Sequence, residues 1–283
     1  MRRFRVGQHL LDERRWLVSG FILCMLCSSV VKADLVGYWN FDEVSGQAVL
    51  DSSAFGNDGS LGGNANAEAS ADPVRVSGFL GSGALQFDGD LDRVTIPDSP
   101  SLSVTGDLTL SAWINVAPGS TNPRNILAKD ANRAYRWRVD GGNDQLWMLL
   151  NDGPSLQVLT SGFNVSSDAG TWRHTAIRYT ASELKVRFYY DGLLVSTRDT
   201  TKGSIADTAG ALTIGSYTSG GAESWNGMLD DVAIWDEALP EFQIAQLASG
   251  LTPLQIPEPS TWVLVSFGVI VLRLRGRSAS RFE

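Results

Sequence analysis

Hydrophobic and polar residues alternate over several short stretches between residues 34 and 256. The clearest stretch is 108–116, where every second residue is apolar: Leu108, Leu110, Ala112, Ile114 and Val116. A two-residue period places these side chains on one face of a strand and the intervening side chains on the other. The pattern therefore predicts an antiparallel strand with one face in a core.

The segment 184–190 also alternates, and it runs into Asp191-Gly192 before a second apolar group at 193–195. An Asp-Gly pair between two such segments is a strong signal for a tight β-hairpin. Further short strands are expected at Arg93–Ile96, Tyr135–Val139, Leu146–Leu150, Arg173–Tyr179 and Ala211–Ile214. Many short strands separated by turn residues predict an all-β sandwich or jelly roll.

One segment, Pro240–Ala248, has a helical pattern, with Pro240 suited to the first turn and Gly250 just beyond the end. This helix would turn Phe242, Ile244 and Leu247 toward the core. The stretch Gly62–Gly83 is rich in Gly, Ala, Asn and Ser, so a long surface loop is expected there.

Residues 1–33 have the pattern of a secretory signal peptide. Arginines precede the apolar run Trp16–Val31, and Val31-Lys32-Ala33 offers small residues at the two positions that a signal peptidase reads. Cleavage is expected after Ala33. Because both cysteines, Cys24 and Cys27, lie in this leader, the mature chain would have no disulfide and no thiol chemistry.

The segment 257–283 has three parts: Pro257-Glu258-Pro259, an apolar run at 262–272, and four arginines. The prolines end the preceding fold, the apolar run partitions into lipid, and the arginines favour the cytoplasmic side of a membrane. A helix over 262–272 would be about 16 Å long, which is short for a hydrocarbon core of about 30 Å. Residues 251–256 would form a linker before this segment.

In the order of its parts and in its PEP letters, this segment resembles the PEP-CTERM sorting signals of bacterial exported proteins. The resemblance implies an exosortase-type processing enzyme as a partner and contact with the membrane through a hydrophobic helix. It implies a final location in the cell envelope or the extracellular matrix. Whether the tail is cleaved or retained as an anchor stays open.

The region between these two signals is strongly acidic. Residues 34–256 contain 27 acidic and 13 basic residues, a net charge of −14. Binding to phosphate backbones depends on basic patches, so nucleic acid is not expected as a partner. The charge favours solubility outside the cell and the binding of divalent cations.

Short motifs also recur in a recognisable order along this region. The first motif is Leu35–Glu43, together with Asp51-Ser52-Ser53 and the turn at 56–59. The later motifs are, in chain order, Gly83–Gly89, the strand around Trp113, Thr171–His174, Tyr190-Asp191-Gly192, Leu212–Gly215 and Asn226–Trp235. In this order they resemble the laminin-G-like (LamG) jelly-roll domains of the concanavalin A-like superfamily. The resemblance implies two stacked antiparallel sheets over residues 34–250, one concave and one convex, with the chain ends close together.

Related sandwiches include laminarinase-type glycoside hydrolases, whose catalytic strand carries Glu-x-Asp-x-x-Glu. Retaining hydrolysis needs two carboxyl groups about 5 Å apart. No two glutamates of residues 34–256 are five positions apart, so that signature is absent. His174 is the one histidine of this region, and a structural role is expected for it because it lies beside Trp172 in a strand. We therefore expect no catalytic residues and no enzyme activity.

Asp230 is the basis of a calcium hypothesis. Alternation places it on the same strand face as Val232 and Ile234, so its carboxylate is expected to point inward, and an inward carboxylate needs compensation. In related sandwiches the aspartate of the final strand binds a structural ion with groups near the N-terminus, which in this chain are Asp42 and Asn57. Alternatively, Asp230 caps a strand end or pairs with an arginine, and Asn57 serves its turn.

Four tryptophans could stack on sugar rings: Trp113, Trp137, Trp147 and Trp225. Core packing is the alternative for most of them. Trp113 faces the polar side of its strand and Trp225 lies in a Gly- and Ser-rich loop, so these two are the expected ligand surface. Trp39, Trp172 and Trp235 lie in the family motifs and are assigned to the core.

Three functional classes remain. The favoured class is an exported, non-enzymatic binding module that recognises an extracellular polysaccharide, a surface glycan or another matrix component. The second is a structural matrix protein without a specific ligand, and the third is a divergent hydrolase that uses aspartates alone.

Overall fold

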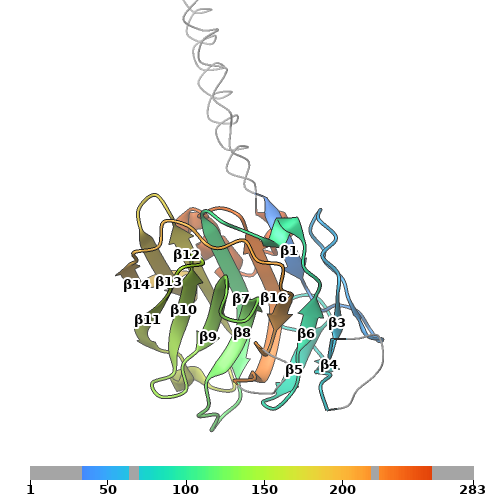
Figure 1. Cartoon of the computed structure of the whole chain (residues 1–283). Coiled ribbons are helices and arrows are strands. Elements are labelled where there is room, and N and C mark those ends of the chain that lie inside the picture. Colours follow the sequence, from blue (N-terminus) through green and yellow to red (C-terminus); the bar gives the residue numbers. More distant parts are fainter. Residues whose placement is uncertain (1–33, 64–69, 218–222, 257–283) are drawn as a thin grey trace, which may run out of the picture. The chain divides into compact units, whose positions relative to one another are not determined.

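The computed structural model describes residues 34–63, 70–217 and 223–256, which form two stacked eight-stranded antiparallel sheets (Figure 1). The first, sheet A, contains in spatial order β14 (Leu193–Asp199), β13 (Lys185–Tyr190), β12 (Arg173–Thr180), β7 (Leu108–Val116), β16 (Asn226–Trp235), β5 (Ala84–Asp88) and β4 (Val74–Val76), and β1 (Leu35–Trp39) also pairs with β16. The pairing of β1 with β16 brings the two ends of the domain together, as expected.

The second sheet, sheet B, faces sheet A across the core (Figure 1). It contains in spatial order β11 (Leu156–Asn164), β10 (Gln145–Asn151), β9 (Tyr135–Val139), β8 (Arg124–Lys129), β15 (Leu212–Ile214), β6 (Val94–Ile96), β3 (Gly59–Leu61) and β2 (Ala48–Val49). In the part of the chain that the structure describes, the short 3₁₀ helices η2 (Pro100–Leu102) and η3 (Ser166–Asp168) lie between strands, and η4 (Pro253–Gln255) follows the last α-helix.

The alternating pattern of β7 is confirmed by its packing. Its five alternating apolar residues, Leu108, Leu110, Ala112, Ile114 and Val116, belong to the core cluster between the two sheets. The intervening residues lie on the outer face of sheet A, and they too are buried. Other parts of the chain therefore cover this outer face. The candidate site lies where one of these covering segments packs on β7.

The hairpin between β13 and β14 is also confirmed. Asp191 and Gly192 both have left-handed backbone angles, with φ of 46° and 77°. Two consecutive positive φ angles are the signature of the type I′ turn, which matches the right-handed twist of the strands.

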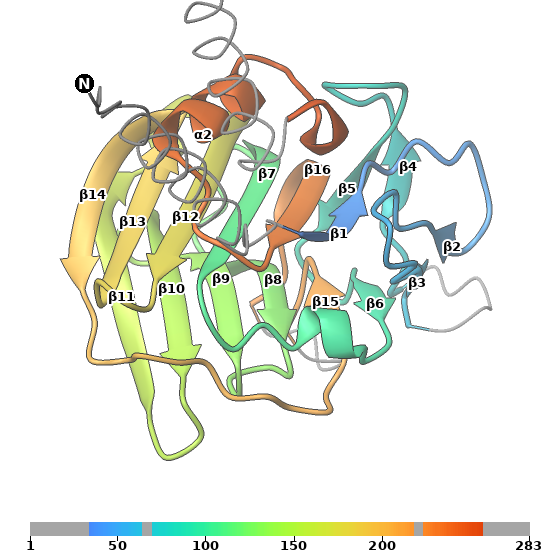
Figure 2. The same ribbon diagram turned by 90° about the horizontal axis from the view of Figure 1, so that it is seen from above.

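The one α-helix of the described residues, α2 (Glu241–Ala248), covers part of the outer face of sheet A beside β12 and β13 (Figure 2). Ile244 and Leu247 pack against Tyr189 and other residues of this face, as expected. The prediction for Phe242 is wrong, since its side chain is 48% exposed and Gln243 is buried instead. Phe242 and Ile244 are two positions apart and therefore point to opposite sides of a helix with 3.6 residues per turn, whereas Gln243, Ile244 and Leu247 share the buried side.

The predicted loop at 62–83 is interrupted by β4, which extends the edge of sheet A by pairing with β5. The small residues around β4 hide this three-residue strand in the sequence pattern. The predicted leader, the Pro257-Glu258-Pro259 motif and the apolar run at 262–272 lie outside the described residues. Within the described ranges, no helix combines the length and the apolar character needed to cross a bilayer.

Candidate functional site

Three aromatic side chains form a cluster on the outer face of sheet A, which we call the Phe79 platform: Phe79, Trp113 and Trp172. The ring centroids of Phe79 and Trp113 are 4.1 Å apart with an interplanar angle of 36°, and those of Phe79 and Trp172 are 6.1 Å apart. Phe79 is 45% exposed, whereas Trp113 beneath it is 6% exposed. The platform therefore presents an open aromatic ring on a buried aromatic support.

The loop that carries Phe79 is fastened by two aspartates distant in sequence. Asp230 Oδ2 accepts hydrogen bonds from the backbone N–H groups of Phe79 at 2.8 Å and Leu80 at 3.1 Å. Asp42 Oδ1 accepts from the N–H groups of Ser82 at 2.5 Å and Gly83 at 2.8 Å. These bonds hold the loop in one conformation, so the Phe79 ring is presented without a further ordering cost.

The structure corrects the expected orientation of Asp230. The register of β16 on β7 shifts between Asp230 and Ala233, and Asp231 takes a φ of 50°. This β-bulge adds one residue to the strand, so the side chains before and after it exchange faces. Val232 therefore points into the core, while Asp230 lies opposite Trp113 on the outer face of sheet A.

Asp230 and Asp231 form a buried acidic pair below the platform. Asp230 is fully buried and Asp231 is 4% exposed, and the hydroxyl of Tyr38 donates to Asp231 Oδ1. Burial raises the pKa of both carboxyl groups above their usual range. The charge of Asp231 raises the pKa of Asp230 further, and Asp42 does the same for Asp231. A proton is therefore held by the pair at pH values where an exposed aspartate is ionised.

The residues expected to bind calcium do not fit that ion. Asn57 donates from Nδ2 to the Val36 carbonyl at 2.7 Å, and its own carbonyl accepts from Trp39 Nε1 at 3.0 Å, so it fastens β1. Asp42 and Asp230 direct oxygens at backbone N–H groups, and calcium needs six to eight oxygen ligands. Across residues 34–63, 70–217 and 223–256, no three Asp, Glu, His or Cys side chains gather in a way that could hold a metal.

The two predicted ligand tryptophans do not share a surface. Trp225 is fully buried in the core between the sheets, and its backbone N–H donates to the Gly215 carbonyl at 2.5 Å. The Gly- and Ser-rich composition around it suggested exposure, but the chain turns inward there to start β16. Trp113 supports the platform from below, and Trp172, which the motif assigned to the core, is half-buried beside it.

Sequence reasoning missed Phe79 itself. Its local signal is the run Gly78-Phe79-Leu80-Gly81, an aromatic residue between glycines in a polar stretch. Gly81 has a φ of 63°, and a Cβ there would lie 2.5 Å from Asp42 Oδ2. The glycine thus allows the close approach of the loop to the carboxylate that holds it.

No catalytic arrangement is evident among the described residues. Ser111 Oγ lies 2.9 Å from His174 Nε2, but both residues are buried and Nδ1 has no hydrogen-bond partner in the described part of the chain. A serine triad needs an acid at that nitrogen. Burial lowers the pKa of His174 to about 3, so the imidazole stays neutral. The Asp230–Asp231 pair is equally closed to a substrate.

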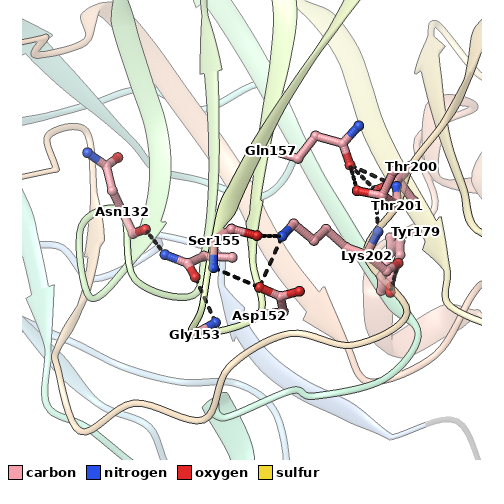
Figure 3. Close-up of polar contacts among 10 residues, drawn as sticks. Asn132, Asp152, Gly153, Ser155, Gln157, Tyr179, Thr200, Thr201 and Lys202 are labelled. Atoms are coloured by element: carbon pink, nitrogen blue, oxygen red, sulfur yellow. Dashed lines mark hydrogen bonds and ion pairs between the residues drawn. The ribbon is translucent and has the colours of Figure 1, made fainter.

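A lysine–serine contact between the segment after β14 and the turn joining β10 to β11 is structural too. Figure 3 shows the Lys202 ammonium directed at Asp152 and Ser155, and its distance to Asp152 Oδ1 is 3.0 Å. The hydrogen bond from Lys202 lowers the pKa of Asp152, so the carboxylate is ionised and pairs with the lysine. Lys202 Nζ is therefore engaged in an ion pair with Asp152, which argues against a role as a base toward Ser155. Gln157 Oε1 accepts from Thr200 and Thr201 nearby, which fastens the same loop (Figure 3).

A second aromatic cluster lies on the outer face of sheet B. The guanidinium of Arg138 lies 4.1 Å from the Trp147 ring centroid, and that of Arg136 lies 3.8 Å from the Tyr217 centroid. Glu223 forms ion pairs with both arginines. Trp147 is only 6% exposed, so its ring has no open face comparable to that of Phe79.

Comparison with known folds agrees with this architecture. Domain 4 of AbnA, an extracellular GH43 arabinanase from Geobacillus stearothermophilus solved with arabinotriose, matches with a TM-score of 0.59 and 19% identity over 77% of this chain and 99% of that domain. The binding domain of Paraclostridial Mosquitocidal Protein 1 matches with a TM-score of 0.59 and 16% identity over 76% of this chain and 52% of that one. These likenesses show the fold.

A third similar structure is the binding domain of botulinum neurotoxin DC in complex with SialylT, with a TM-score of 0.58 and 14% identity over 78% of this chain and 52% of that one. The chain thus spans about half the length of the two toxin domains. No curated protein sequence matches it. The sequence model of the concanavalin A-like lectin/glucanases superfamily matches residues 88–245, more than half of the 283 residues, and the chain therefore belongs to that superfamily.

Proposed function

We propose that this protein is an exported, non-enzymatic module that binds glycans through the Phe79 platform. The observation that carries the proposal is the 45% exposed ring of Phe79, stacked on Trp113 and held by a loop with four backbone hydrogen bonds to Asp42 and Asp230. An aromatic face is an apolar surface that accepts the C–H face of a sugar ring. A fixed ring also loses little entropy when the sugar binds.

The similar structures support a carbohydrate as the partner. The arabinanase domain was solved with an arabinose oligosaccharide, and the neurotoxin domain was solved with SialylT. Both toxin domains are named as binding domains. Since fold likeness alone does not fix function, the platform is the argument that belongs to this chain.

The two ends of the sequence support a location outside the cytoplasm. The leader 1–33 would direct export and be removed after Ala33, and Pro257-Glu258-Pro259 with its apolar run would be read by an exosortase-type enzyme. The mature domain would then reach the cell envelope or an extracellular polysaccharide matrix.

A glycan array probed with residues 34–256 tests the proposal. We expect selective hits with the unchanged domain and at least about a tenfold loss of affinity for Phe79→Ala, equivalent to about 1.4 kcal/mol. Phe242→Ala is the matched control, because Phe242 is 48% exposed on α2 and lies outside the platform. Equal losses for the two variants would refute the platform as the contact site.

The same array separates the alternative functions. A folded domain that binds no glycan would favour a structural matrix component without a specific ligand. New reducing ends after incubation with extracellular polysaccharides would favour the third class, a divergent hydrolase. Neither outcome is expected, because the exposed ring is built as a contact surface and the candidate catalytic groups are buried.

A further inference from the structure

The junction between β1 and β16 has an unusual polar closure. The backbone nitrogen of Asp34 donates to Asp236 Oδ1 at 2.9 Å, and the N–H of Asp236 donates to the Asp34 carbonyl at 3.2 Å. These reciprocal bonds lie directly beyond the paired residues Leu35 and Trp235. The backbone nitrogen of Asp34 is thus hydrogen-bonded to the Asp236 carboxylate at the end of the β1–β16 pair.

Asp236 lacks a compensating cation in the described residues, where no lysine or arginine forms an ion pair with it. Partial burial raises the pKa of Asp236 above its usual value, and the nearby Asp34 carboxylate raises it further. A carboxylate in this setting gains stability from any positive charge placed within hydrogen-bond distance.

The predicted cleavage point is the peptide bond on the nitrogen of Asp34. Hydrolysis by a signal peptidase adds water across the Ala33–Asp34 bond, which leaves a carboxylate on Ala33 and an amino group on Asp34 that takes up a proton. We propose that this new α-ammonium forms an ion pair with Asp236, so that removal of the leader locks β1 onto β16. The inference rests on the export part of the proposed function and is independent of glycan binding.

The surroundings leave the new terminus in contact with water. Asp34 and Asp236 both line a hollow of about 290 Å³, together with Phe55, Ser101 and Thr105. The hollow gives the ammonium room and solvent access, so it can titrate and be followed by NMR. The amide N–H of the unprocessed chain already donates to the Asp236 carboxylate, and the ammonium adds a full positive charge to that contact.

The test uses residues 34–256, which contain every described strand and both apolar clusters and so carry their own core. Three versions are compared: one beginning at Asp34 with a free amine, the same chain N-acetylated, and one beginning at Ala33. In the third version the ammonium is displaced by one residue, about 3.8 Å between Cα atoms. Each is also made with Asp236→Asn, which keeps an acceptor oxygen and removes the charge.

We expect the free Asp34 version to melt about 2–4 °C above the acetylated and Ala33 versions. In the Asp236→Asn background the three should agree within about 1 °C. Two results would overturn the ion pair. One is that the free and acetylated Asp34 versions melt at the same temperature. The other is that acetylation lowers the melting temperature equally with Asp236 and with Asp236→Asn. An NMR titration of the α-amine is a second readout that does not need the Asp236→Asn variant. The pKa of the α-amine in the free Asp34 version should lie about one unit above its usual 7.7–8.0, and a pKa in the usual range would refute the contact.

The intact mass of the protein recovered from its own cells tests the processing step. A mature chain that begins at Asp34 is expected, and another start would overturn the proposal for the natural protein. Glycan-array hits should be the same for all three versions, because the junction is separate from the Phe79 platform. A blank array with an intact ion pair would therefore refute glycan binding and leave the lock standing.

Discussion

Asp230 offers the sharpest test of how the platform is held. Its Oδ2 is the common acceptor for the N–H groups of Phe79 and Leu80, and burial favours its protonated form. Asp230→Asn keeps an acceptor oxygen and removes the ionisable group, whereas Asp230→Ala removes the acceptor. The structure predicts a clear loss of stability for Asp230→Ala and little change for Asp230→Asn.

The magnitude follows from the two hydrogen bonds. A buried N–H left without a partner costs about 1–3 kcal/mol. Because the two N–H groups are only partly buried, Asp230→Ala should lower the free energy of unfolding by about 2–3 kcal/mol, or the melting temperature by roughly 4–10 °C. Asp230→Asn should stay within about 1 kcal/mol of the unchanged domain, since the neutral amide replaces a carboxyl group that is already protonated in the fold.

The raised pKa of Asp230 also predicts the direction in which stability changes with pH. A folded-state pKa above the unfolded value of about 3.9 means that the folded state binds more protons at neutral pH. The contribution of Asp230 to stability is therefore complete below about pH 4 and is lost as the pH rises toward the folded-state pKa. Subtracting the profile of Asp230→Asn from that of the unchanged domain isolates this contribution from the other carboxylates.

The assay is urea unfolding followed by tryptophan fluorescence between pH 5 and pH 9, with equal m-values as the condition for comparing variants. The unchanged domain should lose stability relative to Asp230→Asn as the pH rises. If Asp230→Asn were as unstable as Asp230→Ala, or if the difference grew in the other direction, Asp230 would be ionised in the fold and held by a cation, contrary to the geometry.

Three further results are expected, each measured by thermal unfolding. Adding calcium or a chelator should move the melting temperature of residues 34–256 by less than about 1 °C, and a rise of several degrees with calcium would contradict the fit argument. Gly192→Ala should lower the melting temperature more than Gly119→Ala. Both glycines have a φ of 77°, but a Cβ at Gly192 would lie 3.0 Å from Ala245 Cα in α2, whereas a Cβ at Gly119 would meet open space. Equal losses would show that backbone strain alone matters. Asp152→Ala should destabilise more than Lys202→Met, because it leaves a buried ammonium without its carboxylate, and the reverse order would refute that role.

The fold was accessible from the sequence wherever the signal was local. The alternation at 108–116 and the Asp191-Gly192 turn each depend on residues a few positions apart, and the structure confirms both. The helix also followed from local caps, although its buried stripe was misplaced at Phe242. Local periodicity is strong in these elements because one face meets a continuous core.

The site was less accessible because its parts are joined over long distances. Phe79 and Asp230 are 151 positions apart, so no local pattern links them. The bulge at Asp231 reverses the face that alternation assigns to Asp230, and a single inserted residue leaves no mark in composition. The predicted exposure of Trp225 was wrong for a related reason. The Gly- and Ser-rich composition of a segment indicates a loop, but it does not indicate whether the loop turns toward the core or toward solvent.

The acidity of the domain and the proton held by the Asp230–Asp231 pair below the platform together indicate which class of glycan is favoured as the ligand. Residues 34–256 carry 27 acidic against 13 basic residues, which disfavours the approach of anionic polysaccharides. Burial meanwhile keeps a proton on the Asp230–Asp231 pair, so the support of the Phe79 ring carries less negative charge than its residue types imply. An apolar ring on such a support suits the C–H face of an uncharged sugar. Neutral glycans should therefore dominate the hits on an array, and a preference for sulfated or uronate-rich glycans would direct attention instead to the arginines of sheet B.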